Sequence, residues 1–493
     1  MPKVLVIGAG IAGLAVALRL RNKGYDVAVF EKNNTAGGKI SDFKLGDYRF
    51  DWGPSLFTMP HLIMELFELF DVNSDKYFNY IQKTSSCNYF WEDGTRFVAW
   101  AKKADFVVDA AAVFNEHSST IEKYLDDSEK KYSLTASIFL EKSLHKINTY
   151  LSKDTLKALL HFNSLDLNTS LNAVNQKRFN NPKIIQLFNR FATYNGSDPY
   201  QTPGIMSMIP HLELNLGTYF PENGMRSIAE SLYTLACNQG IEFYFNTDVK
   251  EIVTSNGTAK GIRTEKLEYK ADIIISNSDH YNTFKMLLKK DRKNIVSIPK
   301  QERSSAAIIF YWGIAKKFPE LDLHNILFSK EYQEEFNAIF KDSTIIENPT
   351  IYINITSKDK PSDAPNGCEN WFVMINAPSA SGQDWPLLRA RVRAAIILRI
   401  NSMLKTDIEK YITHEEILDP LGIEAKTGSY GGALYGASSN SKLAAFLRQP
   451  NFSTKIKNLY FCGGSVHPGG GIPLCLLSAK ITSDLIPKAS SLE

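Results

Sequence analysis

The chain has 493 residues, of which 44% are hydrophobic and 22% are charged, which is the composition of a globular protein long enough for roughly three domains. Its 56 basic and 53 acidic residues leave a net charge of +3, so we expect no broad electrostatic field that would bind nucleic acid. The five cysteines are scattered, with no C-x-x-C pair and no metal-ligand spacing. This pattern argues against zinc, any other metal site or a disulfide framework, and it favours a reducing cytoplasm.

The hydropathy pattern predicts no membrane-spanning helix. The longest apolar run, Ala306 to Ala315, is about half the length that a spanning helix needs. A basic run at Lys289, Lys290, Arg292 and Lys293 could contact lipid headgroups, but such runs are more typical of a solvated helix end.

Residues 3–31 form the most informative segment of the chain. An apolar strand leads into Gly8-x-Gly10-x-x-Gly13, which opens a helix, and a second strand ends in Glu31. Gly8 permits a tight turn, Gly10 a close approach to a pyrophosphate, and Gly13 close packing of the helix on the strand. The helix N-terminus suits phosphate groups, and Glu31 is placed to accept hydrogen bonds from an adenosine ribose. The segment therefore predicts a dinucleotide site.

The next segments continue this site. A turn-rich loop contains Gly37, Gly38 and Lys39, where the glycines allow close backbone approach and Lys39 could neutralise a phosphate. A short strand from residue 48 is stopped by Gly53-Pro54. The helix that follows carries an apolar stripe that we expect in the core rather than at a cofactor: Leu62, Ile63, Leu66, Phe67 and Phe70.

The middle of the chain predicts a second domain that interrupts the first. Residues 105–195 are mostly helical in pattern, with one apolar face expected at Leu140, Leu144, Ile147 and Leu151. A helix over 227–239 and strands over 241–249, 251–253 and 271–276 return to the nucleotide domain. Strand-like runs at 307–312, 349–355 and 371–375 predict a mainly antiparallel sheet.

The segment 458–473 resembles the N-terminal site in its geometry. An apolar strand runs into a turn with five glycines between residues 463 and 471, and a helix is expected from residue 474 to 486. A second helix N-terminus could receive the other end of a long cofactor, which favours FAD over NAD. The alternative is a glycine turn that only closes the fold.

Several motifs resemble one family over essentially the whole chain. They include Phe50-Asp51-x-Gly53-Pro54-Ser55, Pro221-x-x-Gly224-Met225, Asn277-x-Asp279 and the ending His467-Pro-Gly-Gly-Gly-Ile-Pro473. Together with the glycine motifs, they resemble the bacterial carotenoid desaturases of the phytoene desaturase type, which are FAD enzymes. Residues 48–60 and 324–329 look most like the hydroxycarotenoid 3,4-desaturases of marine flavobacteria. Two positions depart from the family pattern, because Lys39 stands where relatives often have arginine and Asn223 where they usually have glycine.

The resemblance implies an α/β fold with a discontinuous Rossmann-like FAD-binding domain (1–80, 225–295 and 425–493). The second domain, of antiparallel sheet plus helices (81–224 and 296–424), would bind the substrate and associate with a membrane. The implied cofactor-binding residues are Gly8, Ile11, Ala12, Glu31, Lys32, Gly38, Lys39, Gly53, Pro54, Ser55, Val249, Gly464, Ser465, Gly471 and Ile472.

The resemblance also implies a reaction. A C=C bond would be introduced at C3–C4 of an acyclic, 1'-hydroxylated carotenoid by hydride transfer to flavin N5, with a proton lost from the adjacent carbon. Since the polyene spreads the developing positive charge, positioning matters more than a strong base. We therefore name no catalytic base, and we interpret His467 as structural rather than catalytic.

The expected substrate also predicts where the protein works. About forty apolar carbons would resist transfer to water by on the order of 30 kcal/mol, so we expect uptake from the bilayer by an enzyme bound peripherally to the inner membrane surface, on the cytoplasmic side. The alternatives are a phytoene desaturase, a carotene cis-trans isomerase, an amine oxidase and a non-enzymatic carrier.

Overall fold

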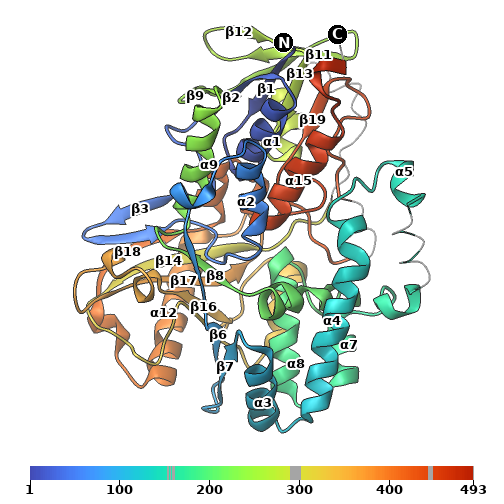
Figure 1. Ribbon diagram of the computed structural model, residues 1–493. Coiled ribbons are helices and arrows are strands. Elements are labelled where there is room, and N and C mark those ends of the chain that lie inside the picture. The colour runs from blue at the N-terminus through green and yellow to red at the C-terminus, as the bar shows by residue number, and fades with distance from the viewer. Residues whose placement is uncertain (153–154, 156, 158–160, 289–300, 442–447, 492–493) are drawn as a thin grey trace.

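A five-stranded parallel sheet organises the upper half of the molecule in Figure 1. The computed structural model describes residues 1–152, 155, 157, 161–288, 301–441 and 448–491, so the basic run at 289–293 lies outside the described residues. Every neighbouring pair of strands in this sheet is parallel, and the strands come from three distant stretches of chain. Their spatial order is β19 (Leu459–Phe461), β13 (Ile273–Ser276), β1 (Lys3–Ile7), β2 (Asp26–Phe30) and β9 (Glu242–Tyr244).

Helix α1 packs against three other helices beside this sheet. Its interior is almost wholly buried, which explains why its sequence is apolar on all sides. The expected core stripe is confirmed, because Leu62, Ile63, Leu66 and Phe67 are buried and Phe70 packs against the same cluster. The four helices are α1 (Ile11–Asn22), α2 (His61–Glu68), α9 (Arg226–Asn238) and α15 (Ile472–Asp484).

A seven-stranded sheet lies in the lower half of Figure 1. All of its pairs are antiparallel except β15 with β6. The mainly antiparallel sheet predicted from three apolar runs is therefore confirmed, and those runs are β14, β16 and β17. The spatial order is β18 (Ile412–Leu418), β14 (Ala306–Ile314), β17 (Glu369–Ala377), β16 (Ile351–Asn354), β15 (His324–Leu327), β6 (Ser85–Phe90) and β7 (Arg96–Trp100).

A group of helices stands at the right of this sheet in Figure 1. They are α3 (Lys103–Phe114), α4 (Ser118–Phe139), α5 (Ile147–Tyr150), α7 (Leu171–Arg178) and α8 (Pro182–Asn189). The predicted apolar face over residues 140–151 is wrong. Helix α4 ends at Phe139 and the chain turns, so Leu140 and Leu144 are buried, whereas Ile147 is 77% and Leu151 79% exposed. A 3.6-residue period continued by chance across a helix end.

Smaller elements complete the fold. The predicted strand over 241–249 is shorter than expected, because only β9 forms there, and helix α15 starts two residues earlier than predicted. None of the helices in the described ranges is long and apolar enough to span a membrane. The other sheets comprise β10 (Glu251–Ser255) with β11 (Thr258–Arg263) and β12 (Glu268–Lys270), β3 (Asp42–Leu45) with β4 (Tyr48–Asp51), and β5 (Tyr80–Gln82) with β8 (Tyr219–Pro221). The remaining helices are α10 (His280–Asn282), α11 (Tyr332–Asn337), α12 (Trp385–Leu404) and α13 (Pro420–Thr427).

Candidate cofactor and substrate site

One cavity of about 500 Å³ brings together all fifteen residues that the sequence assigned to the cofactor. The residues that follow four parallel strands line it, namely Gly8 after β1, Glu31 after β2, Asn277 after β13 and Gly463 near the end of β19. The carboxyl edge of an open parallel sheet is where α/β proteins bind nucleotides. Residues of β14 and β17 also line the cavity, so it extends from the parallel sheet to the seven-stranded sheet.

The first glycine motif forms a tight turn into α1. Gly8 has a φ of +98°, a backbone conformation that residues with a side chain rarely adopt. A Cβ on Gly13 would lie 2.1 Å from the Gly8 carbonyl oxygen, so only glycine allows the helix to approach the strand this closely. The Asn277 amide lies under the same turn, and with its oxygen facing α1 it accepts a hydrogen bond from the Gly13 N–H at 3.2 Å. Ile11 and Ala12 occupy the first turn of α1, where N–H groups have no helical partner.

The Glu31 carboxylate is buried at the cavity wall and holds two loops in place. One oxygen accepts a hydrogen bond from the Ala9 N–H at 2.8 Å. The other accepts from the backbone N–H of Asn33 at 2.9 Å and from its Nδ2 at 2.8 Å. A carboxylate has about four acceptor positions, so these three bonds leave room for a ribose hydroxyl. Glu31 thus has a structural role that the sequence did not indicate.

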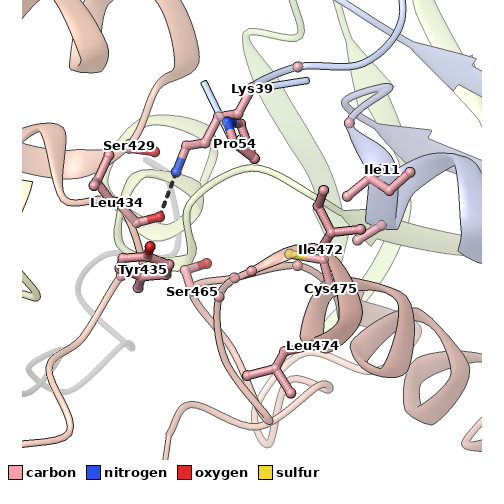
Figure 2. A pocket seen from close by; sticks show the side chains of 18 of the residues that line it. Ile11, Lys39, Pro54, Ser429, Leu434, Tyr435, Ser465, Ile472, Leu474 and Cys475 are labelled. Atoms are coloured by element: carbon pink, nitrogen blue, oxygen red, sulfur yellow. Dashed lines mark hydrogen bonds between the residues drawn. The ribbon is translucent and has the colours of Figure 1, made fainter. Parts of the chain in front are cut away.

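Lys39 and Gly53 lie in the adjoining wall. A Cβ on Gly53 would lie 2.4 Å from the Lys39 carbonyl oxygen, so this contact requires glycine. The Lys39 ammonium group donates to the carbonyl of Leu434 at 3.0 Å, and Figure 2 shows it pointing toward Leu434 and away from Ile11. Burial lowers the pKa of Lys39. Its proposed contact with a phosphate therefore stays a prediction.

The C-terminal glycine turns form the opposite wall in Figure 2. A Cβ on Gly464 would lie 3.1 Å from the Gly470 Cα, so the two turns touch. Ser465 is held by its hydroxyl, which accepts a hydrogen bond from the His280 N–H at 2.9 Å. Gly471 precedes α15, whose first turn at Ile472 faces the cavity. The second helix N-terminus that the sequence predicted is present.

These groups fit an FAD molecule. The N-termini of α1 and α15 both open into the cavity, and each offers N–H groups and a positive dipole end to an anion or an electron-rich group. Backbone rather than side chains lines the glycine turns, which is what close approach of a flat, phosphate-bearing cofactor requires. Lys32 and Val249 also line this cavity, as do Glu31 and Thr247.

A second part of the cavity is apolar. Its wall contains side chains from β14, β17 and the short helical turns at 204–208 and 211–215, together with the end of α4. No sequence pattern identified these side chains as cavity residues. They come from segments far apart in the chain, and each has the periodicity of an ordinary core residue. They are Phe139, Leu140, Leu144, Ile205, Met206, Met208, Ile209, Leu212, Ile309, Phe372 and Met374.

His467 also lines the cavity, and its bonding favours the structural interpretation. Its Nε2 lies 3.0 Å from the carbonyl oxygen of Lys142, and because a carbonyl can only accept, Nε2 carries the hydrogen. Burial lowers the pKa of His467 to about 4, so the ring is neutral and weakly basic near neutral pH. The bond ties the C-terminal glycine turn to the loop that carries Leu140 and Leu144.

The cavity contains no evident metal centre. Within the part of the chain that the structure describes, no group of three or more His, Cys, Asp and Glu residues could hold a metal ion. Burial raises the pKa of Cys475, which lines the cavity, to about 11, so this thiol stays protonated and unreactive.

Comparisons with known proteins agree with this geometry. Residues 11–306 match the family described as flavin containing amine oxidoreductase. The chain is 58% identical to a 1-hydroxycarotenoid 3,4-desaturase from Flavobacterium sp. (strain P99-3), with 100% of both chains covered. It is 30% identical to a 4,4'-diapolycopene oxygenase from Methylomonas sp., with 98% of both covered. An oxidoreductase from Methanosarcina mazei shares the fold, with a TM-score of 0.61 at 16% identity over 97% of this chain and 98% of that one.

These matches confirm three expectations from the sequence: the Rossmann-like α/β fold, the FAD cofactor and a flavin-dependent oxidoreductase. They also argue against the non-enzymatic carrier, since both the family and the relative are flavin oxidoreductases or desaturases. The chain therefore belongs to the flavin-containing amine oxidoreductases and, within them, to the carotenoid desaturase family that its motifs indicate.

Proposed function

We propose that the protein is an FAD-dependent desaturase of an acyclic carotenoid that is hydroxylated at C1 and gains its C=C bond at C3–C4 of the same end. The hydroxyl position expected from the sequence, C1', is corrected to C1 because the relative is a 1-hydroxycarotenoid 3,4-desaturase. The observation that carries this proposal is the single cavity in which a nucleotide-binding half continues into an apolar half. A long hydrocarbon could thus lie against the cofactor. The 58% identity to a 1-hydroxycarotenoid 3,4-desaturase supports the choice of substrate.

In this proposal the cofactor is bound by the fifteen residues that the family resemblance implies, all of which line the cavity. The domain boundaries are those given in the sequence analysis. Glu31 would accept a ribose hydroxyl, and the first turns of α1 and α15 would face the phosphates and the flavin. The bound flavin supplies the hydride acceptor. The apolar wall would orient the polyene and exclude water, and positioning of this kind supplies much of the rate.

The proton leaves from the carbon adjacent to the hydride donor. Tyr435 and His467 are polar groups at the cavity near the C-terminal glycine turns. Burial raises the pKa of Tyr435 to about 12, so its hydroxyl is a poor proton acceptor, and His467 is weakly basic for the reason given above. The chain thus offers no strong base at these two positions. This suits a substrate in which hydride loss leaves positive charge on the polyene, because that charge makes the adjacent C–H acidic.

We also propose peripheral attachment to a membrane, on the cytoplasmic side, through the tip formed by α5 and Leu151. Ile147, Tyr150 and Leu151 are exposed apolar side chains within five residues, and such a cluster is costly in water unless it has a partner. The same loop carries Leu140 and Leu144 into the cavity wall. Lipid that contacts this tip would lie next to the apolar half of the cavity.

The proposal is tested with FAD-loaded protein in liposomes that contain either phytoene or a 1-hydroxylated acyclic carotenoid. We expect loss of two hydrogens and a red-shifted absorption only with the hydroxylated compound. Conversion of phytoene instead would make the protein a phytoene desaturase. Product of unchanged mass would make it a cis-trans isomerase, and peroxide release from amines would make it an amine oxidase.

A further inference from the structure

The apolar half of the cavity has a buried charged network directly behind its wall. Tyr194 lines the cavity, and its hydroxyl donates a hydrogen bond to Glu213. Arg190 Nη2 donates to both oxygens of Glu213 at 3.0 Å. Glu213 is 1% and Arg190 8% exposed. Taking an ion pair out of water is expensive and contributes little to stability, so a network of this kind beside a ligand cavity calls for a functional explanation.

The network fixes the hydrogen-bonding character of Tyr194. Burial and the neighbouring Glu213 carboxylate raise the pKa of Tyr194 well above its ordinary value, so the hydroxyl keeps its proton. That single hydrogen is donated to Glu213, and the phenol oxygen can then offer only its lone pairs to a ligand. The negative charge on Glu213 makes this oxygen a better acceptor, because hydrogen bonds in series polarise one another.

Tyr194 also lies close to the C-terminal glycine turns. Two residues later, a Cβ on Gly196 would lie 2.7 Å from the ring of Tyr435, and a Cβ on Gly470 would lie 2.8 Å from the same tyrosine. The Ser305 N–H donates to the Gly196 carbonyl at 3.0 Å and the Leu434 N–H to the Ser305 carbonyl at 3.1 Å. This packing places the segment 194–196 against the wall that carries Leu434, Tyr435 and Gly470.

This position matters because of the geometry of the substrate. In a carotenoid that is hydroxylated at C1 and reacts at C3–C4, the hydroxyl oxygen is separated from C3 by only three bonds of about 1.5 Å each. Any group that recognises the hydroxyl must therefore lie close to the flavin, and not at the far end of the polyene. Tyr194 lines the cavity, and its segment packs against the wall of the C-terminal glycine turns, where the proposed function expects the flavin.

We propose that Tyr194 is a specificity-determining residue whose phenol oxygen accepts a hydrogen bond from the hydroxyl of the carotenoid, and that Glu213 and Arg190 are positioning residues that hold this oxygen as an acceptor. This inference rests on the proposed function. A substrate without the hydroxyl leaves the Tyr194 oxygen buried against hydrocarbon, which costs a hydrogen bond and lowers the rate for the wrong substrate.

The test compares Tyr194→Phe with wild type on two substrates in liposomes, the 1-hydroxylated carotenoid and the same carotenoid without the hydroxyl. We expect kcat/KM for the hydroxylated compound to fall about tenfold, the effect of one lost hydrogen bond. For the other compound, kcat/KM should stay the same or rise, because phenylalanine leaves no unpaired oxygen against the hydrocarbon. FAD content should not change. The matched control is Tyr89→Phe, because the ring centroid of Tyr89 lies 5.4 Å from the guanidinium carbon of Arg190, as that of Tyr194 does, and Tyr89 is not among the residues that line the cavity.

Equal losses on both substrates, which leave the ratio of the two kcat/KM values unchanged, would overturn the proposal, since they would show a packing role. A second measurement needs no variant: a 1-methoxy analogue cannot donate a hydrogen bond, so wild type should treat it like the compound without the hydroxyl. Full activity with the analogue would contradict the proposal. If wild type converts neither carotenoid, the proposed function fails on its own. The inference is then tested separately by binding, with the dissociation constants of the two carotenoids measured by fluorescence quenching. Tyr194→Phe should weaken binding of the hydroxylated carotenoid about tenfold and should not weaken binding of the other.

Discussion

Glu31→Gln is the substitution that best separates cofactor recognition from folding. Glutamine keeps the shape of the side chain but turns one of the two oxygens into an NH₂ group. If its remaining oxygen accepts from the two Asn33 donors, at 2.9 and 2.8 Å in the present structure, the NH₂ group must face the Ala9 N–H. Two donors then oppose each other, and the charged acceptor for the ribose is lost.

The magnitude follows from the bonds involved. A hydrogen bond to a charged group contributes about 1.5–3 kcal/mol, so loss of the ribose contact should raise the dissociation constant of FAD about 10- to 150-fold. Loss of the Ala9 bond should lower the stability of the apoprotein by a similar free energy. Glu31→Ala should show larger losses in both measurements, because it leaves three donors without an acceptor.

The assay titrates apoprotein with FAD and follows quenching of flavin fluorescence, and thermal unfolding of the apoprotein is measured in parallel. The control is Glu242→Gln, since Glu242 lies exposed on β9 and, among the residues that the structure describes, its carboxylate accepts a hydrogen bond from the Tyr244 hydroxyl. A Glu31→Gln protein that binds FAD as tightly as wild type would refute the ribose contact. An unchanged unfolding midpoint would refute the role of the Ala9 bond.

Three further predictions concern other parts of the molecule. Gly13→Ala should destabilise the protein by about 1–3 kcal/mol and weaken FAD binding, because its Cβ would lie 2.1 Å from the Gly8 carbonyl; equal stability and FAD content in the two proteins would contradict this. Ile147→Ser with Leu151→Ser should reduce co-sedimentation with vesicles at least tenfold, whereas Leu398→Ser, an equally exposed position on α12, should not; equal binding by all three proteins would exclude the α5 tip. Burial lowers the pKa values of His280 and His324 to about 3 and of His467 to about 4, from an ordinary 6.5. Each neutral ring therefore adds stability above pH 6.5 that is lost as pH falls toward these values, at up to about 1.4 kcal/mol per pH unit for each histidine; an unfolding midpoint that is flat between pH 7 and 5 would contradict the buried neutral state.

The nucleotide half of the site could be predicted from the sequence because its parts are local. Gly8, Gly13 and Glu31 belong to one strand, turn, helix and strand unit, in which each residue type follows from backbone geometry. The turns at Gly464 and Gly471 could be predicted for the same reason, because they also belong to one local unit of strand, turn and helix. All of these residues line one cavity.

The apolar half could not be predicted. Met206, Ile309 and Phe372 come from three separate segments and meet only in the folded chain, and each is indistinguishable from a core residue in the sequence. The network behind Tyr194 was missed because Arg190 and Glu213 are 23 residues apart and carry no spacing signal. The stripe ending in Leu151 was misinterpreted because periodicity alone does not show where α4 ends.

The central claim is that this cavity brings a carotenoid against FAD for oxidation by the flavin. FAD-loaded protein is mixed with the 1-hydroxylated carotenoid in liposomes without oxygen or any other electron acceptor. We expect that one flavin is reduced for each new C=C bond, with loss of two hydrogens from the carotenoid and no further product. Desaturated product with the flavin still oxidised, or a substrate that binds and leaves both flavin and mass unchanged, would contradict it.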